Sequence, residues 1–185
     1  MTGPPDEALM QLVRDGDTSK LAVLFDRHHR QLFHFFYRLT SHQDQSEDLV
    51  QDVFFRMLKS RETYQAKTTF AAWMYQVARS AHVDSFRRRK NETQWSDTQP
   101  EPVNREPHVD ERMRKRQEVE LLQKAMAALP EDKREVLVLS RYQNLKYHEI
   151  GEILGCEVGA VKLRVYRAVR ALTQIFQEMS GERVS

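Results

Sequence analysis

The stretch YHEIGEIL (residues 147–154), followed by GCEVG (155–159) and AVKLRVYRAVR (160–170), decides the fold of the second half of the chain. Apolar residues recur at helical spacing on both sides of the turn and predict two short amphipathic helices. Gly155 stands where the first helix has to stop and the chain has to turn. Because two short helices with a tight turn, the second one cationic, are how proteins place a helix in the major groove, the stretch predicts DNA binding.

Composition is that of a helix-rich protein with more than one basic region. The length of 185 residues suits one domain or two small ones. Hydrophobic residues make up 40% of the chain and charged residues 30%, and glycines and prolines are few, which is typical of a helix-rich protein. The net charge of +2 averages over opposed segments, since cations outnumber acids in residues 79–90 and again in 155–170. Two basic segments in different halves predict two separate contacts with nucleic acid.

Several classes of protein are disfavoured. Cys156 is the only cysteine, so neither an intramolecular disulfide nor a cysteine-based zinc site is expected. The first residues, MTGPPDE, are acidic and have no apolar run, unlike a signal peptide, and no stretch approaches the length of a membrane span. We therefore expect a cytoplasmic protein with no membrane insertion of its own.

Residues 91–110 are predicted to be a linker between a first domain, 1–90, and a second domain, 111–185. The segment contains three prolines and five acids and keeps neither helical nor strand periodicity.

Both domains are predicted to be helical, because no segment alternates with a period of two. The expected fold class is therefore all-α, with two small helical domains. Asp44 is the expected N-cap of one helix, with Glu47 completing a capping box, and Val119, Leu122, Met126 and Leu129 are expected to share one side of another. The expected helices cover about 6–15, 20–39, from 44 onward, 69–90, 111–129, 131–142 and the helix-turn-helix pair.

Two helices carry faces that point to partners. In the helix from residue 44, both Gln51 and Asp52 lie three or four residues from Asp48 and from Phe55, so the four residues share a face. Such a face suits either solvent or a docking partner. In the helix from residue 69, aromatic residues alternate with cations, and aromatic rings can stack on unpaired bases. Trp73 has the spacing of a core residue, whereas Tyr75 and the run 87–89 are expected to face solvent or DNA.

Three segments together resemble one family. SEDLVQDVF (46–54), FAAWMYQVARSAHVDSFRRR (70–89) and ALPEDKREV (128–136) with the helix-turn-helix are similar, in the same order, to segments of extracytoplasmic function (ECF) sigma factors of bacterial RNA polymerase. The resemblance implies a protein without catalysis, cofactor or metal. It implies three partners: the largest subunits of the polymerase core, promoter DNA and an anti-sigma factor.

The resemblance also implies which residues meet each partner. Core polymerase is expected to contact Asp48, Gln51, Asp52 and Phe55. The minus-ten promoter element is expected to contact Tyr75, Arg79, Ser80, Asp84, Arg87 and Arg88. The minus-thirty-five element is expected to contact Lys162, Leu163, Arg164, Tyr166 and Arg167.

The chain departs from the family pattern at four positions. Ser80 stands where asparagine is frequent, and a hydroxyl discriminates between bases less well than an amide. Leu163 replaces a serine and can touch a thymine methyl group instead of a phosphate. Glu157 and Lys146 replace serines that cap the two helices of the motif. These differences imply an altered promoter preference.

The same residues give less support to other functions. The histidines at 28, 29, 34 and 42 do not have the spacing of a metal site on one helical face, and HEIGE (148–152) lacks the second histidine of a zinc-protease motif. Cys156 is expected to be a small buried turn residue. The main alternative is a helix-turn-helix transcriptional regulator with an N-terminal signal-binding domain, and a third is an interaction protein that no longer binds DNA.

Overall fold

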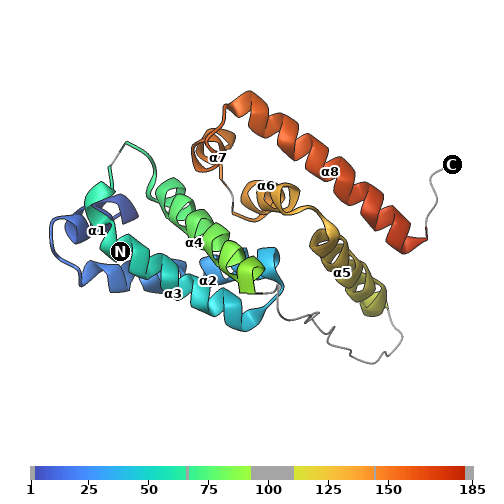
Figure 1. Cartoon of the computed structure of the whole chain (residues 1–185), viewed down its shortest axis with the longest axis horizontal. Helices are drawn as coiled ribbons and strands as arrows, with labels where there is room; N and C mark the ends of the chain where they lie inside the picture. Colours follow the sequence, from blue (N-terminus) through green and yellow to red (C-terminus); the bar gives the residue numbers. More distant parts are fainter. Residues whose placement is uncertain (1–2, 66, 93–110, 144, 182–185) are drawn as a thin grey trace.

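The computed structural model describes residues 3–65, 67–92, 111–143 and 145–181, and every regular element in these ranges is helical (Figure 1). The all-α prediction is therefore confirmed. The predicted linker lies outside the described residues except for its first two, which continue a helix. The elements are α1 (Asp6–Arg14), α2 (Lys20–Thr40), α3 (Gln43–Lys59), η1 (Arg61–Thr63), α4 (Phe70–Glu92), α5 (Glu111–Ala128), α6 (Glu131–Tyr142), α7 (Tyr147–Leu154) and α8 (Val158–Ser180).

The first four α-helices form a bundle in which α2 and α3 pack side by side and α4 packs on α3 (Figure 1). Apolar residues three and four positions apart bury one stripe of each helix. On α2 the buried residues are Leu24, Leu32, Phe35, Phe36 and Leu39, and on α3 they include Leu49, Val50, Val53, Phe54 and Met57.

The predicted capping box of α3 is wrong. The helix begins at Gln43, with His42 at the N-cap, so Asp44 lies inside the first turn. Glu47 accepts a hydrogen bond from the Gln43 side chain at 3.0 Å rather than from the backbone ahead of the helix. Asp44 still suits this position, because a carboxylate in a first turn is favoured by the helix dipole.

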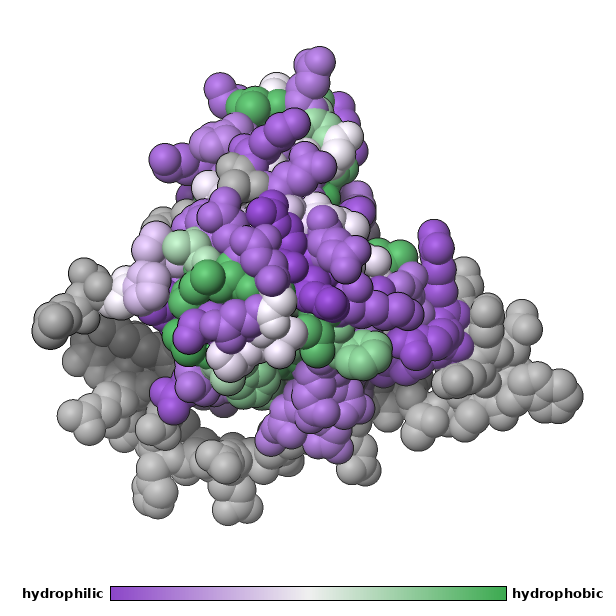
Figure 2. All heavy atoms as spheres, turned by 90° about the vertical axis from the view of Figure 1, so that its left-hand side faces the viewer, coloured by the Kyte–Doolittle hydropathy of each residue, from purple (hydrophilic) through white to green (hydrophobic). Residues whose placement is uncertain are grey.

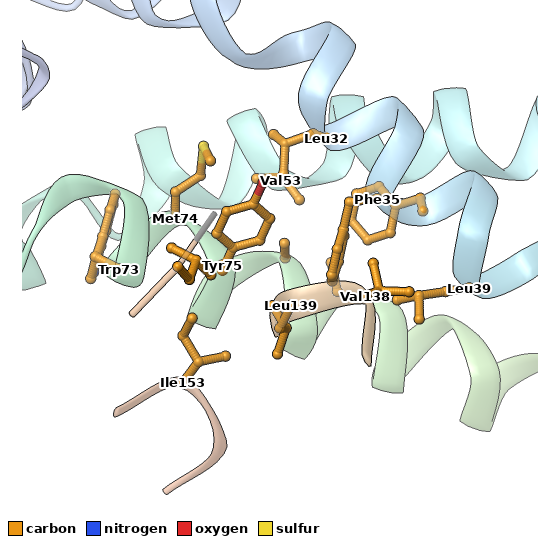
Figure 3. Close-up of a cluster of buried hydrophobic side chains, with 14 of the residues drawn as sticks. Leu32, Phe35, Leu39, Val53, Trp73, Met74, Tyr75, Val138, Leu139 and Ile153 are labelled. Atoms are coloured by element: carbon orange, nitrogen blue, oxygen red, sulfur yellow. The ribbon is translucent and has the colours of Figure 1, made fainter. Parts of the chain in front are cut away.

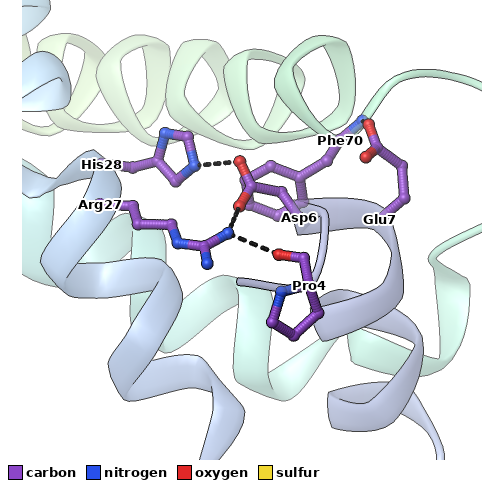
Figure 4. A network of polar contacts seen from close by, with 6 residues as sticks. All are labelled: Pro4, Asp6, Glu7, Arg27, His28 and Phe70. Atoms are coloured by element: carbon purple, nitrogen blue, oxygen red, sulfur yellow. Dashed lines mark hydrogen bonds and ion pairs between the residues drawn. The ribbon is translucent and has the colours of Figure 1, made fainter. Parts of the chain in front are cut away.

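A polar network ties the start of the chain to α2 and α4 (Figure 4). Asp6 accepts from Arg27 at 2.6 Å and pairs with His28 Nε2 at 2.7 Å, and Arg27 also donates to the Pro4 carbonyl at 2.9 Å. The neighbouring Glu7 carboxylate accepts from the backbone N–H of Phe70 at 3.0 Å. Since the first N–H groups of a helix have no partner within it, Glu7 caps α4 from a distant part of the sequence.

Removing this remote cap should destabilise the fold measurably. Glu7→Ala is expected to lower the free energy of unfolding by about 1 kcal/mol, the usual cost of losing a capping acceptor. Glu7→Gln, which keeps an oxygen at the same reach, should lose clearly less. Urea denaturation followed by circular dichroism measures both variants, and equal losses would contradict the capping role.

The second domain is built from α5 to α8, and α8 packs along α5, α6 and α7. Pro130 ends the preceding segment and occupies the N-cap of α6, where a missing N–H costs nothing. The prediction for α5 is only half right: Met126 and Leu129 are buried, but Val119 and Leu122 are exposed. Only the C-terminal part of α5 is buried against its neighbours. Val119 and Leu122 keep the apolar spacing of the helix but lie before this buried part.

One hydrophobic core runs through both domains (Figure 3). Side chains of α2 and α4 meet side chains of α6 and α7 in this core. Within the first domain, the Phe35 ring of α2 packs edge to face on the Tyr75 ring of α4, with centroids 5.1 Å apart. The buried cluster drawn in Figure 3 includes Leu32, Phe35, Leu39, Val53, Trp73, Met74, Tyr75, Val138, Leu139 and Ile153. The expected two bodies therefore share an apolar interface as well as a chain connection.

The face of the molecule that carries α1 is mostly polar. Seen from this end, hydrophilic residues make up most of the surface, with separate groups of hydrophobic residues among them (Figure 2). The exposed apolar side chains of α1 and α2 include Leu12, Val23 and Phe25. Scattered groups of this size are normal for a folded protein.

Candidate nucleic-acid and polymerase interfaces

The helix-turn-helix forms as the sequence predicts, with a longer second helix. α7 ends at Gly155, which adopts the left-handed conformation with φ 64°, and α8 runs on to Ser180. Cys156 is half-buried in the turn, where its backbone N–H donates to the Gly151 carbonyl at 2.9 Å. The Lys146 backbone N–H donates to Glu149 at 2.8 Å, so the carboxylate at the third position of α7 reaches back to the N-cap residue.

Gly151 is the second glycine that this turn requires. A Cβ at this position would lie 2.6 Å from the Cys156 carbonyl oxygen, closer than real side chains approach backbone. α7 therefore packs directly against the turn that follows it.

We predict that Gly151→Ala destabilises the second domain. Forcing an extra methyl group into a packed site costs about 1–3 kcal/mol. Gly159→Ala is the matched control, because nothing lies within 4 Å of a Cβ there and alanine is the better helix former by about 1 kcal/mol. Thermal melting should show a loss for the first variant and no loss for the second; a Gly151→Ala chain as stable as the native one would disprove the contact.

α8 exposes all five residues predicted for the minus-thirty-five element. Val161, Val165 and Ala168 are buried against the domain, which turns the remaining faces outward. Tyr166 is 59% exposed, and the Arg170 guanidinium lies over its ring at 5.9 Å from the centroid. Leu163 is 47% exposed, an apolar side chain on a cationic face. The exposed residues of this face are Lys162, Leu163, Arg164, Tyr166 and Arg167.

α3 presents the face predicted for core polymerase. Asp48 and Gln51 are exposed and Asp52 is half-buried. Phe55 is 64% exposed, although the adjacent Phe54 is buried. An aromatic ring so open to water has no packing role of its own, and it lies beside the acidic residues as an anchor for a partner would.

A groove opens beside this face, between α2 and α3. Its volume is about 380 Å³, and Gln51 contributes to its rim. Phe25 forms its inner wall by packing edge to face on Phe54, with centroids 4.9 Å apart. The groove is lined by Phe25, His29, Arg30, Phe33, His34, Glu47, Val50 and Gln51.

Arg56 joins the predicted polymerase face to the predicted minus-ten helix. Its guanidinium donates to Asp52 at 3.0 Å and, across to α4, to Asp84 at 2.6 Å and Ser80 at 3.4 Å. Sequence reasoning missed this residue. Its spacing of four from Asp52 was a signal for an ion pair within α3, but nothing in the sequence pointed to the contacts with α4.

The residues predicted for the minus-ten element fall into two groups on α4. Ser80, Arg87 and Arg88 are exposed and Asp84 is half-buried. Tyr75 and Arg79 instead lie against the second domain, where Tyr75 is only 1% exposed. The expectation that Tyr75 faces solvent is wrong for the chain by itself, because α6 and α7 cover this part of α4.

The contact between the domains is polar as well as apolar. The Tyr75 hydroxyl donates to Gln143 at 2.5 Å, and Arg79 donates to Glu135 at 3.0 Å. Burial raises the pKa of the Tyr75 hydroxyl, which keeps it protonated as a donor. Burial also raises the pKa of Glu135, and Arg79 opposes that shift.

Two of these partners were not predicted from the sequence. Glu135 directly precedes four buried apolar residues of α6, and a charge at the head of a buried run was a signal that it needed a partner. Gln143 lies after the end of α6 and gave no signal. Trp73 is buried, as its spacing predicted.

Two kinds of feature are absent from the described residues. In those ranges no three His, Cys, Asp or Glu side chains come together in a way that could hold a metal ion. No helix within them is long and apolar enough to cross a membrane.

Comparison with known proteins decides the family. Sigma-70 region 2 matches residues 24–92, and Sigma-70 region 4 matches residues 119–172. The first contains α3 and α4, and the second contains the helix-turn-helix. The chain is an ECF sigma factor. Members of this family initiate transcription and are not enzymes.

Relatives of this sigma factor are similar along most of its length. The RNA polymerase sigma factor CarQ of Myxococcus xanthus is 28% identical over 94% of this chain and 98% of its own. The ECF RNA polymerase sigma factor SigE of Mycolicibacterium smegmatis is 29% identical over 97% of this chain and 72% of its own. The sigma factor RpoE of Bartonella quintana, solved in complex with the anti-sigma factor NepR, superposes with a TM-score of 0.68 and 26% identity, over 84% of this chain and 96% of RpoE.

Proposed function

We propose that this ECF sigma factor brings core RNA polymerase to promoters through three surfaces. α3 docks on the largest polymerase subunits, α4 opens and binds the minus-ten element, and α8 reads the minus-thirty-five duplex. The first domain, 1–90, would carry the first two surfaces, and the second domain, 111–185, would carry the third. Because contacts on linked domains act in tandem, each can be weak while the assembled complex is tight.

One observation carries this proposal. α8 buries Val161, Val165 and Ala168 and holds its cations outward on an otherwise unobstructed helix face. Long cationic side chains suit both guanine edges and phosphates. The exposed Leu163 suits a thymine methyl group, which would give the chain a base preference unlike that of a serine-bearing relative.

Control by an anti-sigma factor is part of the proposal. B. quintana RpoE, whose fold this chain shares, forms a complex with the anti-sigma factor NepR. We infer a partner of the same kind here, acting in the cytoplasm where the polymerase is found. The groove between α2 and α3 adjoins the predicted polymerase face, so one inhibitor could cover both.

Run-off transcription tests the proposal. Purified chain and core polymerase, incubated with a genomic DNA library, should yield transcripts that start at specific promoters and that core polymerase alone does not make. The complete absence of such transcripts would reject a sigma function.

A gel shift separates this function from that of a helix-turn-helix regulator. A sigma factor should bind promoter duplex weakly by itself and tightly together with core polymerase. Equal, tight binding with and without the polymerase would instead identify an ordinary DNA-binding regulator.

A further inference from the structure

Ser80, Arg56 and Asp84 form a polar cluster where α3 and α4 pack against each other. Ser80 and Asp84 lie one turn apart on α4, so both side chains leave the same face of the helix. The Arg56 guanidinium reaches across from α3 and donates through Nη1 to Asp84 at 2.6 Å and to Ser80 at 3.4 Å. Asp52, one turn before Arg56 on α3, accepts from Nε at 3.0 Å and so restrains the guanidinium from its own helix.

The cluster keeps hydrogen-bonding groups that the protein itself does not use. Among the described residues, Arg56 Nη2 has no acceptor and Asp84 Oδ1 has no donor. Because Ser80 Oγ accepts from Arg56, its own hydrogen stays available as a donor. A ligand can reach these groups, since Ser80 is exposed and the Asp84 side chain is 45% exposed.

A carboxylate on this helix points to a base rather than to the DNA backbone. Arg87 and Arg88 are exposed on the following turn of α4 and suit phosphates, whereas the Asp84 carboxylate repels them. An ionised carboxylate only accepts hydrogen bonds. In a DNA strand the strong donors are the ring N–H and amino groups of the bases, so the partner of Asp84 is expected to be a base edge.

Cytosine is the base whose edge complements the cluster. Arg56 lies between Ser80 and Asp84 in the chain of bonds, so the cluster presents a hydroxyl donor, a guanidinium donor and a carboxylate acceptor in that order. The Watson–Crick edge of cytosine carries the O2 acceptor, the N3 acceptor and the N4 amino donor, also in order. Adenine lacks the second acceptor, and thymine and guanine place a carbonyl oxygen where cytosine has its amino group. Pairing of an aspartate with the cytosine amino group is a recurrent base contact.

We propose that Ser80, Arg56 and Asp84 bind an unpaired cytosine of the minus-ten strand, with the hydroxyl on O2, the guanidinium on N3 and the carboxylate on the amino group. The inference rests on the proposed function, in which α4 contacts the minus-ten element. It adds the identity of the base and makes Arg56 of α3 part of the site. A free serine hydroxyl can donate or accept and discriminates poorly, but the bond from Arg56 fixes Ser80 as a donor.

The test compares two strands that differ only at the base edge. The full chain, without polymerase, is titrated with fluorescent oligodeoxycytidine and oligodeoxyuridine of equal length, at slightly alkaline pH where cytosine is unprotonated. At low salt, phosphate contacts hold either strand, so the ratio of the two affinities reports the base. We expect oligodeoxycytidine to bind about tenfold more tightly or better, the discrimination of a well-matched base edge.

Two variants assign this preference to the cluster. In Asp84→Asn the amide can donate to uracil O4 as well as accept from cytosine, so the ratio should fall close to one. Ser80→Ala removes one donor from an exposed position and should lower the ratio by a smaller factor. The matched control is Asp26→Asn, which removes an exposed carboxylate from α2 and should keep the full ratio.

The ratio also distinguishes base binding from a purely structural ion pair. If Arg56 and Asp84 only hold α3 against α4, Asp84→Asn lowers the melting temperature but leaves the ratio unchanged, and the proposal is overturned. Because both strands are bound by the same folded population, a loss of stability alone does not change the ratio. Circular dichroism checks that each variant keeps its helices.

The remaining outcomes separate this proposal from the proposed function. Equal affinity of the native chain for the two strands, or no binding of either strand at low salt, would overturn the cytosine site even if run-off transcription succeeds. A preference for cytosine that Asp84→Asn abolishes, together with no run-off transcripts, would support the site and reject the sigma function.

Discussion

Reversing two charges on α8 is expected to abolish transcription from promoters that have a minus-thirty-five element. In Lys162→Glu with Arg167→Glu, two exposed cations become anions on the face that is proposed to enter the major groove. Each base or phosphate contact of this kind contributes about 1–3 kcal/mol, and the new carboxylates add repulsion from phosphate. Because 1.4 kcal/mol corresponds to about tenfold in binding, run-off transcription should fall by about a hundredfold or more.

Lys124→Glu is the matched control for this experiment. Lys124 is an exposed cation of the same domain, but it lies on α5 rather than on the proposed reading face. The control should retain transcription, and thermal melting should show that neither protein has lost its fold. Full transcription by the α8 variant would identify an interaction protein that no longer reads DNA.

The second large effect is expected at Phe55. Its ring is 64% exposed on the α3 face proposed to dock on core polymerase. Truncating an aromatic anchor at the centre of an interface typically weakens the binding free energy by at least about 2 kcal/mol. Phe55→Ala should therefore weaken binding to core polymerase by about thirtyfold, measured with immobilised core enzyme in the absence of DNA.

Phe86→Ala provides the comparison, since Phe86 is an exposed aromatic residue of α4. It should leave the affinity for core polymerase unchanged. The stability of the Phe55→Ala chain should stay within about 0.5 kcal/mol of the native one, because exposed positions contribute little to folding. Native affinity in Phe55→Ala would place the polymerase interface elsewhere.

Helical periodicity predicted most of the architecture because each helix buries a stripe that the local sequence records. Gly155 and Pro130 marked the ends of segments for steric reasons that do not depend on tertiary context. The N-cap of α3 was missed by two residues because cap geometry depends on the preceding turn as well as on which residue can cap. Val119 looked buried because apolar spacing says which residues share a face, but not how far a neighbouring helix extends along it.

The candidate site was predictable only where its residues face outward. Lys162, Arg164 and Arg167 lie outside the buried stripe of α8, so helical periodicity alone was enough to predict their exposure. Tyr75 and Arg79 also stand among apolar residues, and no local pattern shows that a second domain covers them. The Arg79–Glu135 pair joins residues 56 positions apart, a separation at which single-sequence periodicity carries no information.

Arg56 gives the two binding surfaces of the first domain a common thermodynamic element. Asp52 on the proposed polymerase face and Asp84 on the proposed promoter face share one guanidinium. Any ligand that draws one carboxylate away changes how strongly the other is held, so the free energies of the two binding events are linked. By reciprocity, whatever factor polymerase imposes on the affinity for the melted strand, the strand imposes equally on the affinity for polymerase. On the proposed function, a single side chain that bridges α3 and α4 would couple enzyme recruitment to strand capture.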